Sequence, residues 1–327
     1  MTPEMVVNRI NDAMKIANDV LQRHAAAVIC TVPSLCAFCQ PHLALKSLKS
    51  SVFSISSYLF CLAFAPPTMS LKNAVITGAN RGLGLELCRQ LSLDERYQTI
   101  YALCRKTSPE LTELASKNQK IGIVDGVNVT DNGVGIKLGS FFRTDTTDEP
   151  IIPIHLLIHN AGAYGPPKDC VDAQAMYASQ SLETITRERM RFALELNTLA
   201  PLFVTQALLP NLQATGKVII ISSLMGSIRD NTAGAHYGYR TAKAAANMVG
   251  KTLAMDLKSP ERQIAVGMIH PGFVATGFDG GKKRREGQRD VDVCVKGVLQ
   301  AVDQVTLETT GCFLHGGYGE GVRPLDW

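Results

Sequence analysis

Residues 73–84 read Asn73-Ala-Val-Ile-Thr77-Gly78-Ala-Asn80-Arg81-Gly82-Leu83-Gly84, a short apolar run that leads directly into a cluster of glycines. Leu85, Leu87 and Leu91 follow at spacings typical of a helix. Glycines let the backbone turn sharply and approach a pyrophosphate, which the N–H groups and the dipole of the helix N-terminus then hold. The segment predicts a strand, a turn and a helix that bind a dinucleotide, with a purely structural turn as the alternative. The absence of Gly-Lys-Ser/Thr excludes a P-loop.

The composition of the whole chain is that of an ordinary globular protein. Its 327 residues are 46% hydrophobic and 19% charged, and 33 Lys and Arg against 29 Asp and Glu leave a net charge of only +4. At about 150 residues per domain, this length allows two domains. So small a net charge indicates no basic face for nucleic acid. Because no run of 18 or more strongly apolar residues occurs, we expect no integral membrane domain.

The first 70 residues differ in composition from the rest. No Asp or Glu occurs between Val20 and Leu85, and serine is dense between residues 47 and 57. Such composition is typical of organelle transit peptides. Three interpretations of residues 1–70 stay open: a presequence for an organelle such as a plastid, a disordered extension, or a start placed too early, since Met69 lies just before the first predicted strand. Cys36 and Cys39 form an isolated C-x-x-C, so we expect no metal site.

From Leu71 onward, short apolar runs alternate with helical stretches, a pattern typical of βαβ units and a parallel sheet. Ser108 and Pro109 provide an N-cap and a first-turn proline for one helix. The expected strands cover residues 73–77, 99–104, 121–124, 154–159, 217–221 and 264–269, and the clearest helices cover residues 187–209 and 239–257. We therefore expect residues 71–327 to form a single doubly wound, Rossmann-type α/β domain.

The charge after the second strand predicts the nucleotide. An Asp or Glu there would bind the ribose 2′-hydroxyl of NAD, whereas this strand ends in Cys104-Arg105. Arg105 and Arg81 can both pair with a 2′-phosphate, and we expect no carboxylate nearby to oppose them. The sequence therefore favours NADPH/NADP, with solvated surface arginines as the alternative.

Tyr239 and Lys243 are four positions apart, which places a phenol and an ammonium on one helical face. A nearby positive charge lowers the pKa of a phenol, so Tyr239 is a candidate proton donor. Tyr164 and Lys168 have the same spacing, but the two prolines between them prevent a regular helix.

Two more polar residues belong to this constellation. Ser223 follows the fifth predicted strand at the carboxyl edge of the sheet, where doubly wound folds bind ligands. Asn197 interrupts an apolar helical run, where Asn is poorly favoured. A strand-end cap for Ser223 and a buried structural amide for Asn197 are the alternatives.

Six ordered motifs resemble the short-chain dehydrogenase/reductase family. They are Thr77-Gly-x-x-x-Gly-x-Gly84, Asn160-Ala-Gly162, Asn197, Ser223, Tyr239-x-x-x-Lys243 and Pro271-Gly-x-x-x-Thr276. Within that family, the segment from Tyr239 to Lys243, the stretch Ile228-x-x-Asn-Thr232 and the ending from Gly311 to Trp327 are most similar to the sniffer-type carbonyl reductases and their bacterial C-factor relatives.

The resemblance implies a sheet of about seven strands and a role for each motif. Tyr239 would donate a proton to a carbonyl oxygen, and Lys243 would lower its pKa and bind the nicotinamide ribose. Ser223 would orient the substrate oxygen, Asn197 would hold a water that relays protons to Lys243, and Thr276 would bind the carboxamide. The implied cofactor-binding residues are Thr77, Gly78, Asn80, Arg81, Gly82, Leu83, Gly84, Arg105, Asn128, Val129, Asn160, Ala161, Gly162, Tyr239, Lys243, Pro271, Gly272, Val274 and Thr276.

The chain departs from the family's pattern at three places. His159 stands where the family has the first residue of Asn-Asn-Ala-Gly, and Asn128 stands where an Asp meets the adenine. Asn keeps an acceptor oxygen, so we still expect that contact. Residues 316–322 form an insertion to which we assign no function.

These features predict an NADPH-dependent reductase of a small-molecule aldehyde or ketone. Two alternatives stay open: a dehydrogenase that oxidises a secondary alcohol or a steroid, and a non-catalytic NADP-binding redox sensor. Residues 282–285, Lys-Lys-Arg-Arg, predict a mobile, solvated loop beside the substrate, and an anionic substrate would be attracted there. We expect a homodimer or homotetramer, located in the cytoplasm unless residues 1–68 are a presequence.

Overall fold

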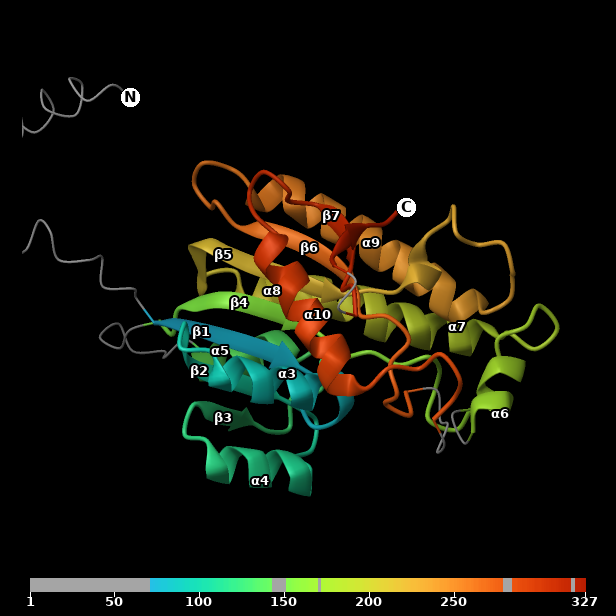
Figure 1. The fold of residues 1–327 in the computed structure, drawn as a ribbon, viewed down its shortest axis with the longest axis horizontal. Coiled ribbons are helices and arrows are strands. Elements are labelled where there is room, and N and C mark those ends of the chain that lie inside the picture. The colour runs from blue at the N-terminus through green and yellow to red at the C-terminus, as the bar shows by residue number, and fades with distance from the viewer. Residues whose placement is uncertain (1–70, 143–150, 170–171, 279–283, 319–320) are drawn as a thin grey trace, which may run out of the picture. The chain divides into compact units, whose positions relative to one another are not determined.

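The apolar runs of the sequence form the strands of one sheet, which has helices on both faces (Figure 1). The computed structural model describes residues 71–142, 151–169, 172–278, 284–318 and 321–327. Predictions for residues 1–70, and for Lys282 and Lys283, fall outside the described residues. The structure therefore addresses the predicted α/β domain alone.

The strands are β1 (Lys72–Thr77), β2 (Tyr97–Leu103), β3 (Ile121–Val124), β4 (Ile154–His159), β5 (Leu212–Ile221), β6 (Ala265–His270), β7 (Cys312–His315) and β8 (Arg323–Pro324). The helices are α3 (Gly82–Leu93), α4 (Pro109–Lys117), α5 (Val134–Phe142), α6 (Ala173–Ala178), α7 (Arg187–Leu194), α8 (Ala200–Leu208), α9 (Tyr237–Leu257) and α10 (Val291–Gln304). Two short turns complete the described elements, the π-helical η1 (Glu195–Leu199) and the 3-10 helical η2 (Leu224–Gly226).

The sheet has the strand order β3-β2-β1-β4-β5-β6-β7-β8. The first seven strands in that order are parallel, and β8 is antiparallel to β7. This confirms the doubly wound α/β fold of about seven strands, and the described residues add a short eighth strand, β8. The additional strand has only two residues, too few to show an apolar period in the sequence.

Successive side chains along each strand point to opposite faces of the sheet and pack in two separate hydrophobic cores. Ala74 and Ile76 of β1 pack in the core under α3, α4 and α10, whereas Val75 packs in the core under α5, α8 and α9. Ile219 and Ile220 of β5 divide in the same way. Because both faces are covered, the strands read as continuous apolar runs.

The chain reverses its direction of travel across the sheet between β3 and β4, so β1 and β4 lie side by side. The carboxyl ends of such strands are the switch point at which doubly wound sheets bind ligands. The glycine-rich turn follows β1, and Asn160 follows β4 directly. The fold therefore brings two of the predicted motifs to the same edge.

The local predictions for two helices have different outcomes. The Ser108 hydroxyl accepts a hydrogen bond from the N–H of Leu111 at 3.2 Å, which confirms the N-cap of α4. The single helix expected over residues 187–209 is divided, since the π-helical turn η1 separates α7 from α8. Asn197 lies in that turn. Such π turns occur frequently at functional sites.

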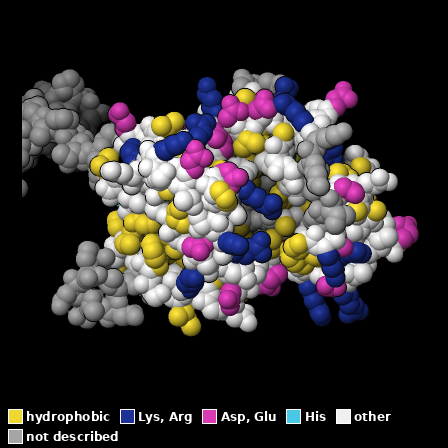
Figure 2. Space-filling view, turned by 90° about the horizontal axis from the view of Figure 1, so that it is seen from below, with side chains coloured by type: hydrophobic (Ala, Val, Ile, Leu, Met, Phe, Trp, Pro, Cys, Tyr) yellow, Lys and Arg dark blue, Asp and Glu magenta, His cyan; other side chains and the backbone are white. Residues whose placement is uncertain are grey.

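The surface shows no single dominant charge on the face seen in Figure 2, where Lys and Arg side chains alternate with Asp and Glu among the described residues. None of the helices in the described part of the chain combines the length and the apolar character needed to cross a membrane. In the same part of the chain, no three His, Cys, Asp or Glu side chains are grouped so that they could hold a metal ion.

Candidate active site

The glycine-rich turn has the backbone geometry that its sequence predicts. Gly78 and Gly82 have φ values of +67° and +55°, in the left-handed region that favours glycine. A Cβ at Gly84 would lie 2.2 Å from the carbonyl oxygen of Gly78, so only glycine fits there. No side chain caps the N-terminus of α3. Its first N–H groups are thus oriented for an anion such as a pyrophosphate.

Hydrogen bonds join this turn to the end of β4. The Thr77 hydroxyl accepts bonds from the N–H groups of Asn160 at 3.1 Å and Ala161 at 3.0 Å. The Asn160 side-chain amide donates to the carbonyl oxygens of Thr77 at 3.0 Å and Gly78 at 3.1 Å. Asn160 therefore holds the glycine-rich turn in place.

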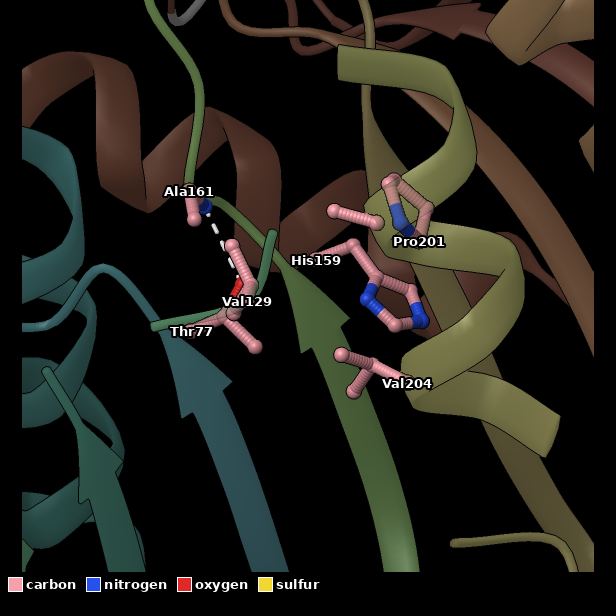
Figure 3. A pocket seen from close by; sticks show the side chains of 7 residues that line it. Thr77, Val129, His159, Ala161, Pro201 and Val204 are labelled. Carbon is pink, nitrogen blue, oxygen red and sulfur yellow. Dashed lines mark hydrogen bonds between the residues drawn. The ribbon is translucent and has the colours of Figure 1, made fainter. Parts of the chain in front are cut away.

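A small pocket lies between the carboxyl ends of β1 and β4 and helix α8 (Figure 3). The His159 side chain extends from β4 toward Pro201 and Val204, which lie on the α8 side of the pocket. The His159 Nε2 and the Thr205 hydroxyl form a buried hydrogen bond of 2.7 Å. Burial lowers the pKa of His159 to about 3. A neutral imidazole that bonds to a helix therefore takes the place of the family's Asn.

The loop after β2 covers the glycine-rich turn. The Ser108 hydroxyl donates to the Asn80 carbonyl oxygen at 2.6 Å, and the Asn80 amide donates to the carbonyl oxygen of Lys106 at 3.4 Å. Arg81 and Arg105 are both exposed on these two segments. Lys106, also exposed beside Arg105, adds a cation that the sequence analysis did not single out.

A carboxylate lies beside Cys104, the residue that precedes Arg105. Asp125 follows β3 and accepts a hydrogen bond from the Cys104 thiol at 3.6 Å. A further hydrogen bond from the Thr107 hydroxyl is the main cause that lowers the Asp125 pKa. The sequence could not show this proximity, because the register of β2 beside β3 brings the two strand ends together.

Asn128 and Val129 follow β3 on the same edge. The Asn128 side-chain oxygen accepts a hydrogen bond from the Thr130 hydroxyl at 3.1 Å. Val129 is buried and lines the pocket of Figure 3. The acceptor expected to meet an adenine is thus also used within its own turn.

The four predicted catalytic residues come from two helical elements and one strand end. Tyr239 and Lys243 lie on α9, Ser223 directly precedes η2 after β5, and Asn197 lies in η1. The Lys243 Nζ donates to the carbonyl oxygen of Ile221 at 2.8 Å and lies 5.6 Å from the centre of the Tyr239 ring. Tyr239 and Ser223 share a hydrogen bond. All four side chains are buried.

Asn197 approaches Lys243 across Gly162. A Cβ at Gly162 would lie 2.9 Å from the Asn197 Oδ1 and 3.8 Å from the Lys243 Nζ. The Asn197 amide donates to the carbonyl oxygens of Ala163 and Ala193, each at 2.9 Å. Its Oδ1 is buried and has no hydrogen-bond partner among the described residues. An acceptor so placed fits the expected water beside Lys243.

The pKa shifts at this site arise mainly from burial. Burial raises the pKa of Tyr239, and the hydrogen bond with Ser223 acts in the opposite direction. The expected lowering by Lys243 is therefore not found. Lys243 is itself buried, and its Nζ is bonded to a backbone carbonyl. Burial lowers the pKa of Lys243 to about 8.

The Pro271–Thr276 segment approaches the glycine-rich turn from β6. A Cβ at Gly82 would lie 3.3 Å from the Thr276 methyl carbon, so Thr276 borders the turn. Pro271 is buried, Gly272 has a φ of +89°, and Val274 pairs with Arg289 in an isolated bridge. These four positions therefore belong to the same edge of the sheet.

Tyr318, in the insertion 316–322, contacts this segment. Its hydroxyl accepts a hydrogen bond from the N–H of Phe273, and a Cβ at Gly272 would overlap its ring. The sequence by itself indicates no function for the insertion. A tyrosine among glycines was the only signal that it carries a contact.

The expectation of a solvated loop over residues 282–285 is wrong for Arg285, whereas Arg284 is exposed as expected. Arg284 forms an ion pair with Asp290 at 2.7 Å. The Arg285 guanidinium packs over the rings of Tyr177 and Phe273, 5.2 and 4.8 Å from their centres, and donates to the Tyr177 hydroxyl at 2.6 Å. Aromatic neighbours from distant segments, which sequence spacing does not show, hold Arg285.

Tyr164 and Lys168 do not form a second site. Lys168 pairs with Glu188 at 2.8 Å, whereas the Tyr164 hydroxyl donates to the Met225 sulfur at 3.3 Å. The Tyr164 ring instead stacks on the Tyr239 ring, with a centre-to-centre distance of 4.3 Å. Tyr164 is therefore a site residue through its ring, although the prolines before Lys168 indicated no helical Tyr–Lys pair there.

Comparison with known proteins agrees with this arrangement. The family model described as short chain dehydrogenase matches residues 72–287. The chain is 35% identical over 163 residues to the C-signal of Myxococcus xanthus, covering 49% of this chain and 87% of that protein. It is 28% identical over 247 residues to the 1-hydroxy-2-glutathionyl-2-methyl-3-butene dehydrogenase of Rhodococcus sp. (strain AD45), covering 75% of this chain and 96% of that protein.

Two solved structures are similar over 79% of this chain. The NADPH-bound carbonyl reductase from chicken fatty liver is 28% identical with a TM-score of 0.63, and 99% of that chain is covered. The carbonyl reductase Sniffer of D. melanogaster is 26% identical with a TM-score of 0.62, and all of that chain is covered. The similarity thus extends over the fold and the site together.

Proposed function

Because the chain belongs to the short-chain dehydrogenase family, we propose that it reduces an aldehyde or ketone to the alcohol with NADPH. The observation that carries this proposal is the grouping of Tyr239, Ser223, Lys243 and Asn197 beside the glycine-rich turn. A phenol, a hydroxyl, an ammonium and an amide in one buried site can polarise a carbonyl group and protonate it.

NADPH supplies the hydride when it is bound. The groups that would hold its pyrophosphate are the first N–H groups of α3, where Gly78 and Gly84 allow a close approach. Arg81 and Arg105 are exposed on the two segments that would face a 2′-phosphate. The names of the NADPH-bound carbonyl reductase from chicken fatty liver and of the NADP-dependent (R)-specific alcohol dehydrogenase of Lentilactobacillus kefiri support this cofactor.

Tyr239 donates a proton to the carbonyl oxygen as negative charge develops there. Burial raises its pKa, so the phenol keeps its proton at neutral pH until an acceptor is present. Ser223 orients the same oxygen through its hydroxyl. Lys243 holds a positive charge below pH 8, and Asn197 presents its buried Oδ1 toward Lys243 for a proton-relaying water.

The same pKa shift favours reduction over oxidation. An enzyme that oxidised a secondary alcohol would use Tyr239 as a base, and a raised pKa makes the phenolate scarce. A redox sensor that performs no turnover would not require the four catalytic side chains to converge. Carbonyl reduction is therefore the function that the site supports best.

A homodimer or homotetramer is part of the proposal. Phe203 of α8 and Met248 of α9 are 48% and 68% exposed, and Met255 of α9 is also exposed. Large apolar side chains grouped on a protein surface commonly mark an interface. Sedimentation equilibrium should give twice or four times the 35.4 kDa chain mass, whereas the single chain mass would contradict the proposal.

The proposed function is tested by following NADPH absorbance with a panel of aldehydes and ketones. We expect consumption of NADPH with at least one carbonyl substrate, and much slower consumption of NADH. The corresponding alcohols with NADP⁺ should react more slowly at pH 7. An absence of turnover with every carbonyl, together with turnover of alcohols, would reverse the proposed direction.

A further inference from the structure

Tyr164 lies in the middle of a group of aromatic side chains beside the proton donor. We define this aromatic box as the four rings around it, those of Tyr177, His236, Tyr239 and Phe278. Tyr164 stacks on Tyr239 with an interplanar angle of 13°. It meets the other three rings edge to face, with centre-to-centre distances of 5.7 Å to Tyr177, 5.6 Å to His236 and 6.3 Å to Phe278. The box thus surrounds one planar ring, and that ring belongs to Tyr164.

Ring packing holds the Tyr164 side chain in the box more than hydrogen bonding does. Its side chain is 5% exposed, yet its hydroxyl donates to the thioether sulfur of Met225, a weak acceptor. A buried tyrosine hydroxyl usually has a stronger partner. Leaving the box would therefore cost Tyr164 little in hydrogen bonding.

The backbone beside Tyr164 is held by Asn197 and by Thr77 of the glycine-rich turn. The carbonyl oxygen of Ala163 accepts a hydrogen bond from the Asn197 amide at 2.9 Å. Ala161 is bonded to Thr77. A substrate ring can therefore enter only if the Tyr164 side chain rotates, since the backbone is fixed to the site. Phe278, 39% exposed, forms the solvent side of the box.

We propose that Tyr164 is the specificity-determining residue of this site, because its ring occupies the space that the ring of an aromatic carbonyl substrate would take beside Tyr239. The inference rests on the proposed carbonyl reduction and adds a size limit to it. Small aldehydes reach the Tyr239 hydroxyl while Tyr164 stays in the box. Substrates with a wide aromatic ring system must displace it.

The experiment compares propanal, benzaldehyde and 2-naphthaldehyde, which carry the same reacting group on no ring, one ring and two rings. Each variant is compared with the unchanged protein on the same aldehyde, so intrinsic reactivity cancels. Tyr164→Ala empties the box, and we expect kcat/KM for 2-naphthaldehyde to rise about tenfold or more, the scale of relieving an overpacked site. The rise should be smallest for propanal and intermediate for benzaldehyde, so the ratio of kcat/KM for 2-naphthaldehyde to kcat/KM for propanal should increase about tenfold or more.

Tyr164→Phe is the matched control, because it keeps the ring and removes only the hydroxyl that contacts Met225. It should reproduce the wild-type order of the three aldehydes. Tyr164→Trp enlarges the ring and should lower kcat/KM for 2-naphthaldehyde further. Binding of NADPH and the melting temperature of each variant report whether the fold is kept.

An equal loss of kcat for all three aldehydes in Tyr164→Ala would overturn the proposal, since Tyr164 would then only support the Tyr239 ring. Unchanged selectivity would overturn it as well. A second measurement does not depend on turnover: isothermal titration calorimetry with 2-naphthalenemethanol should show tighter binding to Tyr164→Ala than to the unchanged protein. If no aldehyde is reduced by any form, the proposed function fails, and this binding comparison still decides the role of Tyr164.

Discussion

The Lys243 Nζ donates a hydrogen bond to the carbonyl oxygen of Ile221, 2.8 Å away at the end of β5. This bond holds the ammonium at the strand edge while burial lowers its pKa to about 8. Lys243 is therefore charged at pH 7 and loses its charge as the pH rises through 8, well below the ordinary range for lysine.

We expect kcat/KM for carbonyl reduction to be constant from pH 6 to 7.5 and to fall above about pH 8, where Lys243 becomes neutral. Initial rates at saturating NADPH and low substrate measure this profile. Lys243→Arg keeps its charge throughout the range, so any activity that it retains should not fall near pH 8. A wild-type profile that stays flat to pH 9.5 contradicts the role given to the Lys243 charge.

Arg105→Asp should weaken NADPH binding selectively. The substitution removes one partner of the 2′-phosphate and adds a repulsive charge, so we expect the Kd for NADPH to rise about 10- to 100-fold, the scale of a charge-assisted hydrogen bond. The Kd for NADH should change little. Fluorescence titration measures both constants.

Asp125→Asn is the matched variant for this test, because it removes the carboxylate that contacts Cys104, the residue before Arg105. It should leave NADPH binding unchanged or make it tighter. If Arg105→Asp raised the Kd values for NADPH and NADH equally, Arg105 would support the loop and would not bind the 2′-phosphate.

His159 should make the protein sensitive to acid. Its pKa is about 3 in the folded protein and about 6.5 when unfolded. As the pH falls below 6.5, the unfolded chain binds a proton that the folded chain does not, so the free energy of unfolding decreases by up to about 1.4 kcal/mol per pH unit until pH 3. His159→Asn removes this dependence. When the free energy of unfolding is measured with urea at several pH values between 4 and 7, it should depend less steeply on pH in the variant.

His236→Asn serves as the control for that measurement. His236 is only half-buried, and its left-handed backbone conformation, with φ of +55°, suits Asn. His236→Asn should change the pH dependence of the free energy of unfolding less than His159→Asn does. Identical slopes in His159→Asn and the unchanged protein would show that the His159–Thr205 contact is not linked to acid stability.

A protein that begins at Met69 should keep its activity. Every predicted site residue lies at Thr77 or beyond, and β1 begins at Lys72. We expect kcat/KM within about twofold of the full chain, the range of a surface change. Insoluble protein or loss of NADPH binding would place residues 1–68 within the folded unit, against the proposed boundary.

The strands could be predicted where their side chains face two cores. β3 and β4 cover the predicted residues, because both faces of each are apolar or covered. β5 begins at Leu212, five residues before the prediction, since Gln213, Thr215 and Gly216 interrupt its apolar run. The two-residue β8 depends on pairing with β7, which no local pattern reveals.

The site could be predicted where a motif carries its own geometry. The glycine-rich turn and the Tyr239-x-x-x-Lys243 spacing are local patterns, and they lead to the positions found in the structure. The stacking of Tyr164 on Tyr239 and the approach of Asp125 to Cys104 join segments far apart in the chain. Such contacts depend on the tertiary fold, so residue types and spacing did not indicate them.

The central claim is that Tyr239 is the proton donor, and Tyr239→Phe tests it most directly. Phenylalanine keeps the ring that stacks on Tyr164 and removes only the hydroxyl that bonds to Ser223. We predict that the Kd for NADPH stays within about twofold while kcat for a good carbonyl substrate falls about 100-fold or more, the loss expected for a positioned general acid. A Tyr239→Phe protein that binds NADPH and reduces the same substrate at a near-normal rate would contradict the account.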